Sequence, residues 1–336
     1  MTGDEAVLRL SRGKVAFPGR DGRPFEAVRD VSLTLRKGEI LGLVGESGCG
    51  KSTTARAMLG LQPLTSGALE LRGRPVRRRD PALRSAVQAI FQNPAGSFNP
   101  KRSLLDSVIE PLRVHKRGSK AERRERALAE LARVGITAQL AGRRPGEVSG
   151  GQCQRAAIAR ATILRPDVLI CDEPVSALDV SIQAQILELL AELRAEQGLT
   201  MLFISHDLSV VASLCDRTAV MYGGTVVEEG PTPRVAGAPL HPYTVILHDS
   251  VPSPDLWAED EVRLRMRPGV GGDGRSQPGC PFEPLCPSAT DVCASERPAP
   301  EPSGGEHRAA CHHPFQGVDA AAPATQAADA SKGTPT

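Results

Sequence analysis

Eight residues, GESGCGKS at positions 45–52, have the types and spacing of a loop that surrounds phosphate groups. Glycines let backbone N–H groups approach a phosphate chain, and the amino terminus of a following helix adds favourable partial charge. In that geometry Lys51 reaches the β- and γ-phosphates of a nucleotide and Ser52 binds Mg²⁺. An apolar stretch precedes the loop and helically spaced apolar residues follow it, as such a loop requires. The predicted phosphate-binding residues are Gly45, Glu46, Ser47, Gly48, Cys49, Gly50, Lys51, Ser52 and Thr53.

A second stretch, VLICDEP at 168–174, supplies two adjacent carboxylates. Four apolar residues bring Asp172 to the end of a buried strand, where its carboxylate can hold Mg²⁺. Glu173 follows and is placed to polarise an attacking water, a general-base role that contributes roughly 10²- to 10⁴-fold in rate. A solvated acidic strand end is the alternative interpretation, and an Asp-Glu-Pro sequence directly after a buried strand disfavours it. The two stretches together predict a nucleotide hydrolase.

Strand-like and helix-like segments alternate along most of the chain and would position these residues. Residues 5–45 predict short strands, and 65–73 and 200–207 predict further ones. Helices are expected after the phosphate loop, over 119–135 and after Pro174. Such alternation predicts a mostly parallel sheet covered on both faces. The basic residues of 119–135 are expected to form a solvated helix face.

The bulk composition excludes several classes of protein. The 336 residues suffice for about two domains. A net charge of +2 disfavours a general nucleic-acid binder, and 3% aromatic residues leave few rings for stacking on single strands. No apolar run is long enough to span a bilayer, and the amino terminus lacks the apolar core of an export signal. We therefore expect a cytosolic protein that does not bind nucleic acid.

Four further motifs identify a family. VSGGQCQR at 148–155, with FQNP, SALD and ISHD around it in a fixed order, resembles the nucleotide-binding subunit of ATP-binding cassette (ABC) transporters over residues 5–235. The resemblance implies an α/β P-loop cassette with a mostly parallel core sheet, an antiparallel β subdomain and a helical subdomain. It also implies ATP and Mg²⁺ as ligands.

The resemblance carries roles to individual residues. Glu173 and His206 would act in catalysis with Gln92, which also senses Mg²⁺ beside Ser52 and Asp172. Phe17 is the best placed residue to stack on adenine, and Phe25 is the second choice. A signature segment would contact ATP held by an opposing subunit, and Asp179 would lie at the dimer seam. That segment comprises Ser149, Gly150, Gly151 and Gln152.

Two positions depart from the family pattern. Val148 replaces the usual leucine at the start of the signature and keeps an apolar contact. Cys153 stands where the family often has a basic residue, so one positive charge near the γ-phosphate is expected to be missing.

Beyond residue 238 the sequence resembles the carboxyl-terminal extension of oligopeptide and dipeptide importer ATPases. PLHPYTVILHDSVPSPD at 239–255 and the cysteine-bearing segment GCPFEPLCP at 279–287 carry this resemblance. We therefore expect an ATPase domain over 5–238, a small loop-rich extension over 239–316 and a disordered tail over 317–336.

Four cysteines of the extension lie within 32 residues, in the pattern C-x₅-C-x₆-C-x₁₇-C. Structural zinc sites favour closer pairs, and iron–sulfur ligands are often followed by proline, as two of these are. An iron–sulfur cluster, which the resemblance implies to be [4Fe–4S], is the first interpretation, zinc the second and metal-free thiols the third. His312 and His313 are expected to be exposed, or to substitute as ligands. The predicted metal ligands are Cys280, Cys286, Cys293 and Cys311.

The resemblance implies an ATP-hydrolysing subunit of a peptide importer at the cytoplasmic face of the membrane. Its implied partners are a second, homologous ATPase subunit in a heterodimer, two transmembrane permease subunits and an extracytoplasmic peptide-binding protein. Within transport, an ATPase for nickel, another small solute or export is the alternative. A non-transport ABC ATPase is disfavoured, because only about 120 residues separate the phosphate loop from Asp172.

Overall fold

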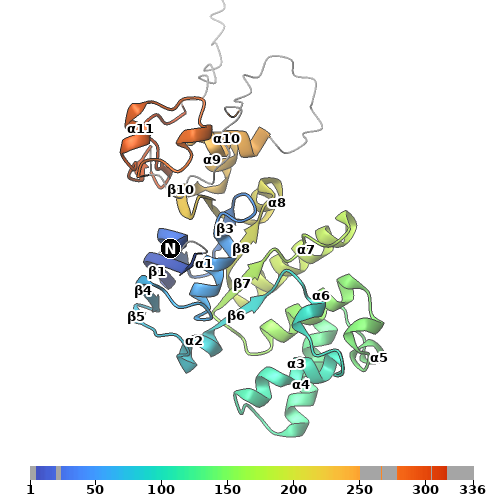
Figure 1. Ribbon diagram of the computed structural model, residues 1–336. Helices are drawn as coiled ribbons and strands as arrows, with labels where there is room; N and C mark the ends of the chain where they lie inside the picture. The colour runs from blue at the N-terminus through green and yellow to red at the C-terminus, as the bar shows by residue number, and fades with distance from the viewer. Residues whose placement is uncertain (1–4, 20–23, 250–265, 267–277, 304, 316–336) are drawn as a thin grey trace, which may run out of the picture.

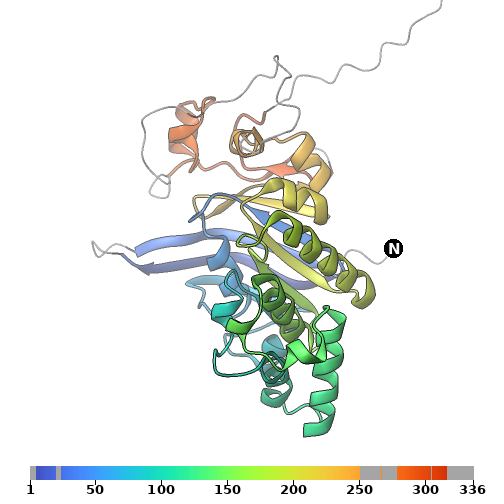
Figure 2. The ribbon, with the colours of Figure 1, turned by 90° about the vertical axis from the view of Figure 1, so that its right-hand side faces the viewer.

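The computed structural model describes residues 5–19, 24–249, 266, 278–303 and 305–315. These residues form three regions (Figures 1 and 2). A sheet flanked by helices lies in the middle, helices from residues 104–162 lie at one end, and the segment after residue 231 lies at the other. In the described part of the chain, every helix is too short or too polar to cross a bilayer.

The central sheet positions most of the predicted site residues. Its parallel part is buried along nearly its whole length, as expected for apolar strands covered on both faces. The strand pairs from β9 to β6 are parallel and those from β11 to β9 are antiparallel, which confirms the prediction of a mostly parallel core. Among the described residues the strand order is β11 (Glu301–Pro302), β12 (Arg308–Ala309), β10 (Thr225–Pro231), β9 (Arg217–Tyr222), β3 (Ile40–Val44), β8 (Thr200–Ser205), β7 (Val168–Asp172) and β6 (Val87–Ile90).

A separate antiparallel sheet packs beside the central one. The sequence predicted short strands over 5–45, but β1 and β2 are each 13 residues long. Arg12 and Asp30 take left-handed φ angles of 48° and 57° inside these strands, near shifts in their register. A bulge interrupts the side-chain alternation of a strand and so resembles a strand end in the sequence. The strands predicted from the sequence were therefore too short. The strand order is β2 (Pro24–Arg36), β1 (Ala6–Pro18), β4 (Ser66–Leu71) and β5 (Arg74–Pro75).

The helices divide between the flanks of the sheet and the two ends of the molecule. The predicted helix at 119–135 is α4, which starts at a capping box in which Ser119 and Glu122 each accept the other's backbone N–H. Its basic residues are largely exposed, as predicted. The α-helices are α1 (Lys51–Met58), α2 (Pro81–Ala86), α3 (Leu104–Val114), α4 (Lys120–Arg133), α5 (Ala138–Ala141), α6 (Gly150–Thr162), α7 (Val180–Gln197), α8 (Leu208–Leu214), α9 (Thr232–Gly237), α10 (Pro242–Asp249) and α11 (Asp291–Ser295); 3₁₀ turns are η1 (Ala95–Ser97), η2 (Pro145–Glu147) and η3 (Glu283–Leu285).

The carboxyl-terminal extension shares both a sheet and a core with the rest of the chain. Strand β12 pairs with β10, with Ala309 opposite Glu228. Phe282 is fully buried, and its ring lies 5.1 Å from that of Tyr222 on β9. The boundary at 238/239 stays a prediction, and the predicted tail over 317–336 lies outside the described residues.

Candidate functional site

The predicted phosphate loop connects the end of β3 to the start of α1, and its backbone requires glycine at two positions. Gly45 and Gly50 have φ angles of 150° and 114°. A Cβ on Gly50 would lie 2.4 Å from the carbonyl oxygen of Ala27, and one on Gly45 would lie 2.2 Å from that of Met221. The loop is therefore held too closely against β2 and β9 for any larger residue.

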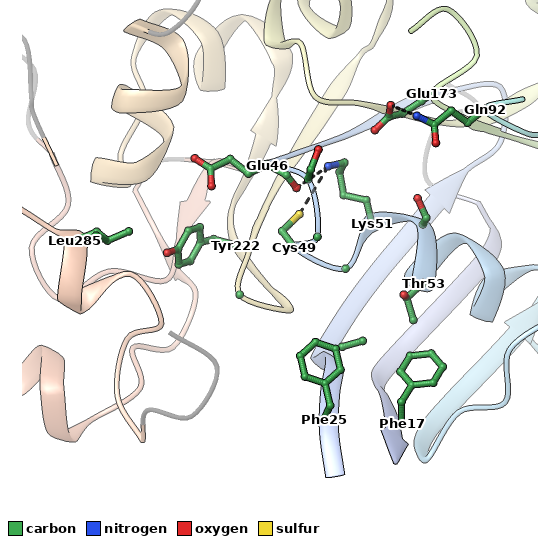
Figure 3. A pocket seen from close by; sticks show the side chains of 16 residues that line it. Phe17, Phe25, Glu46, Cys49, Lys51, Thr53, Gln92, Glu173, Tyr222 and Leu285 are labelled. Atoms are coloured by element: carbon green, nitrogen blue, oxygen red, sulfur yellow. Dashed lines mark hydrogen bonds between the residues drawn. The ribbon is translucent and has the colours of Figure 1, made fainter. Parts of the chain in front are cut away.

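Lys51 lies inside this loop. Its Nζ donates hydrogen bonds to the carbonyl oxygens of Gly45, over 2.6 Å, and Glu46, over 2.9 Å. The residue is only 4% exposed. A cation is thus centred in the loop (Figure 3), where it can exchange carbonyl oxygens for those of a phosphate chain.

Ser52 and Asp172 bring two oxygen ligands together from opposite sides of the site. Ser52 Oγ on α1 donates a hydrogen bond to Asp172 Oδ1, at the end of β7, over 2.9 Å. Burial raises the pKa of the Asp172 carboxyl, and the hydrogen bond from Ser52 opposes that shift. A hydroxyl beside a carboxylate fits Mg²⁺, which prefers oxygen ligands.

Three further predicted residues lie close together at the same edge of the central sheet. Gln92 Nε2 donates a hydrogen bond to Glu173 Oε2 over 3.0 Å, and His206 Nδ1 lies 3.5 Å from that same oxygen. The three side chains follow the carboxyl ends of β6, β7 and β8. Glu173 has a φ of 49°, and its N–H is bonded to the Ile204 carbonyl. Non-glycine residues in this conformation concentrate at functional sites.

These elements surround a cavity of about 820 Å³, a size suited to a nucleotide. Phe17 and Phe25 face each other across β1 and β2 and form one wall, with 36% and 44% of their surfaces exposed (Figure 3). Both rings are therefore available to a base. The other predicted residues that line it are Glu46, Ser47, Gly48, Cys49, Gly50, Lys51, Ser52, Thr53, Gln92 and Glu173.

Four lining residues were missed by sequence analysis. Ala27, Tyr222, Gly223 and Leu285 complete the cavity wall. The Tyr-Gly-Gly turn between β9 and β10 gave a local signal for a tight turn, but none for a ligand. Leu285 comes from the extension, and its place in this wall follows only from long-range packing.

The predicted signature segment lies outside this cavity. Ser149 caps α6: its Oγ accepts the backbone N–H of Gln152, and the side-chain Oε1 of Gln152 accepts the backbone N–H of Ser149. Ser149 and Gly150 are exposed, so the amino terminus of α6 faces outward. Asp179 precedes α7 and is also exposed. The signature segment and Asp179 therefore do not line the chain's own cavity.

The two departures from the family pattern occupy apolar surroundings. Val148 is half-buried and packs against the core. Cys153 is 2% exposed, and burial raises the pKa of its thiol. The Cys153 side chain faces the core, and the expected loss of a positive charge near a γ-phosphate stays a prediction.

The four clustered cysteines line one small cavity together with His241, which lies 39 or more positions earlier in the chain. None of the four forms a disulfide bond, and burial raises the pKa of Cys280 to about 11 and of Cys311 to about 12. Within the described ranges no set of three ligand-type side chains has the arrangement of a metal site. His312 and His313 also line this cavity, and their Nε2 atoms are hydrogen-bonded to the Glu296 carbonyl and to the Thr290 hydroxyl, so their role as substitute ligands stays a prediction.

Two family models match the chain. The model described as ABC transporter matches residues 28–176, and that described as oligopeptide/dipeptide transporter, C-terminal region, matches residues 227–293.

Curated relatives match almost the whole chain. The oligopeptide transport ATP-binding protein OppF of Escherichia coli (strain K12) is 45% identical over 315 residues, which cover 90% of this chain and 94% of OppF. The oligopeptide transport ATP-binding protein AppF of Bacillus subtilis (strain 168) is 41% identical over 320 residues, or 92% of this chain and 97% of AppF.

Solved cassettes have the same fold. The ATP-binding cassette MJ0796, in a dimeric post-hydrolysis state bound to ADP and Pi, matches with a TM-score of 0.61 and 29% identity. It covers 67% of this chain and 98% of its own. CbiO1 of Clostridium perfringens, part of the transporter complex cbiONQ, matches with a TM-score of 0.62 and 28% identity, covering 70% and 92%.

Proposed function

The chain belongs to the ATP-binding subunits of ABC transporters, in the oligopeptide transport group, and on that premise we propose that it hydrolyses ATP to drive peptide import. ATP hydrolysis is supported above all by one observation: Lys51, Ser52, Gln92 and Glu173 line the same cavity. The assignment to peptide import rests on the relatives, which are oligopeptide transport ATP-binding proteins, and on the match of residues 227–293 to the oligopeptide/dipeptide transporter C-terminal region.

Each part of the cavity has one task in the proposed reaction. Lys51 and the loop amides bind the phosphates, and Phe17 or Phe25 holds the base. Glu173 accepts a proton from the attacking water. Gln92 and His206 contact the Glu173 carboxylate and thereby orient it and the water. Ser52, Asp172 and Gln92 would hold Mg²⁺, which would supply neutralisation of the negative charge on the phosphates.

A second ATPase subunit completes the site. The exposed start of α6 is absent from the chain's own cavity, which supports a role for Ser149 to Gln152 on ATP held by the opposing subunit. Asp179 lies at the seam between the two. ATP binding closes the pair and hydrolysis releases it. We assign the second subunit to a different, homologous chain.

The permease partners are two transmembrane subunits, and an extracytoplasmic binding protein delivers the peptide. The chain acts at the cytoplasmic face of the membrane. Docking uses the helical end of the molecule, where a cavity of about 380 Å³ is lined by Arg102, Glu110, Val114 and Arg160. Val114 is 65% exposed there.

The cysteine cavity holds an iron–sulfur cluster in this proposal, with zinc as the alternative. Four thiols that line one cavity suit either metal, since both bind thiolates. The bound metal would supply a covalent staple between segments 280–293 and 311. Because burial raises the pKa of the Cys280 and Cys311 thiols, metal binding must release the protons of these two residues.

Uptake of labelled di- and oligopeptides tests the function. Cells that lack the gene are complemented with the parent protein or with Glu173→Gln. Restored uptake with the parent alone supports both the peptide assignment and the role of Glu173. Uptake that never depends on the gene, while the assembly still hydrolyses ATP, removes the peptide assignment and directs attention to nickel and other small solutes.

A further inference from the structure

Tyr243, on α10 of the extension, contacts the phosphate loop directly. Its Oη accepts the backbone N–H of Glu46 over 2.9 Å, across 197 positions of sequence. The side chain is 1% exposed, and its ring is packed against those of Tyr222 and Phe282 at centroid distances of 4.7 and 5.4 Å. The hydroxyl is therefore held in a fixed position against a loop that must receive phosphate.

His241, two residues earlier, lines the cavity of the four cysteines. Its Nδ1 accepts the N–H of Tyr243 over 3.1 Å, so the ring proton must be on Nε2. That Nε2 is buried and, within the described residues, has no hydrogen-bond partner. A buried donor without an acceptor is costly, and here it belongs to a residue that lines a sulfur-rich cavity.

A second series of contacts connects the cysteine cavity to the nucleotide cavity. The loop between Cys280 and Cys286 carries Phe282, which packs on Tyr243, and Leu285, which lines the nucleotide cavity. Any change in the spacing of those two cysteines therefore acts on the aromatic cluster and on the cavity wall.

We infer that His241 and Tyr243 couple the cysteine cavity to ATP binding. His241 donates its Nε2–H to a sulfur atom of the thiolate-bound group, and Tyr243 fixes the phosphate loop through the Glu46 amide. The role of His241 rests on the metal site of the proposed function, whereas the role of Tyr243 does not. Both are positioning residues, and neither touches the reacting atoms.

The Tyr243 half is tested by equilibrium binding of a non-hydrolysable ATP analogue with Mg²⁺ to the full-length protein. Tyr243→Phe removes only the hydroxyl, and we expect its Kd to rise about two- to tenfold, the range for loss of one buried hydrogen bond. Thr244→Val is the matched control, because the buried Thr244 hydroxyl has no partner in the described structure. Its Kd should equal that of the parent.

The His241 half is tested by a matched pair on anaerobically purified protein. His241→Asn keeps an acceptor near Nδ1 and removes the Nε2 donor, whereas His241→Gln supplies a donor near Nε2. We expect His241→Asn to lose metal to a chelator several times faster than the parent, and His241→Gln to lose it at nearly the parent rate. If iron is bound, His241→Asn should also lower the midpoint potential.

Coupling predicts a third result. The ratio of the analogue's Kd between metal-loaded and metal-stripped parent should differ severalfold from one, and the ratio for Tyr243→Phe should lie closer to one, with the remainder carried by the path through Phe282 and Leu285. Equal Kd values for the parent and Tyr243→Phe, or an equal rise in Thr244→Val, would overturn the role of Tyr243. Metal-free parent protein would overturn the proposed metal site and the role of His241, and failure of every form to bind the analogue would overturn the proposed function itself.

Discussion

Gln92 donates a hydrogen bond to the carboxylate of Glu173 over 3.0 Å, although 81 positions separate the two residues. They follow the ends of β6 and β7, which are parallel neighbours, so the sheet brings both to one edge. One carboxylate oxygen also lies within reach of His206. Three strand ends thus control the orientation of a single carboxylate.

Glu173→Gln should lower the ATPase rate about 10²- to 10⁴-fold, because the amide cannot accept the proton of the attacking water. ATP binding should persist, since the amide oxygen can still accept from Gln92. Steady-state turnover and ATP binding are the two measurements. Glu188→Gln, on the exposed face of α7, is the control with parent activity. Near-parent turnover by Glu173→Gln would reassign the base.

Asp172→Asn should abolish Mg²⁺-dependent hydrolysis while it stabilises the nucleotide-free protein at neutral pH. Burial raises the pKa of Asp172 above its ordinary value of 3.8. The group therefore stabilises the folded protein at pH values below 3.8, and this stabilisation is lost as the pH rises through the pKa of the folded state. Asparagine avoids burying the charge and can still accept from Ser52. We expect Tm to rise by roughly 2–4 °C for each kcal/mol gained. A lower Tm at pH 7 than the parent would contradict this account.

Phe17→Ala and Phe25→Ala should separate the two candidates for the adenine contact. Loss of a stacked aromatic ring costs about 1–3 kcal/mol per base, or roughly 5- to 100-fold in Kd. The larger loss should come from Phe17→Ala, and Phe17→Tyr should bind like the parent. Equilibrium binding of ATP is the measurement. Parent-like binding by both alanine variants would remove the aromatic wall from the site.

Gly150→Ala and Gly151→Ala should differ in a diagnostic way. A Cβ on Gly150 would meet Leu178 at 3.6 Å, an ordinary contact, whereas one on Gly151 would meet Ile182 at 2.8 Å. Gly150→Ala should therefore keep the parent Tm yet weaken ATP-dependent pairing and turnover, because its methyl group would face the opposing ATP. Gly151→Ala should also lower Tm. Full activity in Gly150→Ala would place the signature away from the partner's nucleotide.

Cys293→Ala should lose most of the metal bound by anaerobically purified protein, because one of four thiolate ligands is absent. Cys215→Ala, which changes a buried thiol outside that cavity, should keep the parent content. Iron, sulfide and zinc contents per chain are the readouts. Equal metal content in the two variants would exclude the cysteine cavity as the binding site.

Local patterns predicted the phosphate loop, the acidic end of β7 and α4. Each depends on side-chain types at short spacing, such as GESGCGKS or the capping pair Ser119 and Glu122. The lengths of β1 and β2 were wrong, because bulges at Arg12 and Asp30 resemble strand ends. The sequence did not indicate which way the Cys153 side chain points, and only the packing of α6 shows that it faces the core.

The sequence alone determined which residues could bind phosphate, hold Mg²⁺ and accept a proton, since those properties belong to individual side chains. Only the tertiary structure decided that Tyr243 holds the Glu46 amide, that Leu285 lines the nucleotide cavity and that His241 joins four distant cysteines. The physical reason is that such long-range contacts, which span 197 positions for Tyr243 and Glu46, depend on how sheet and extension pack together, and no local pattern encodes that packing.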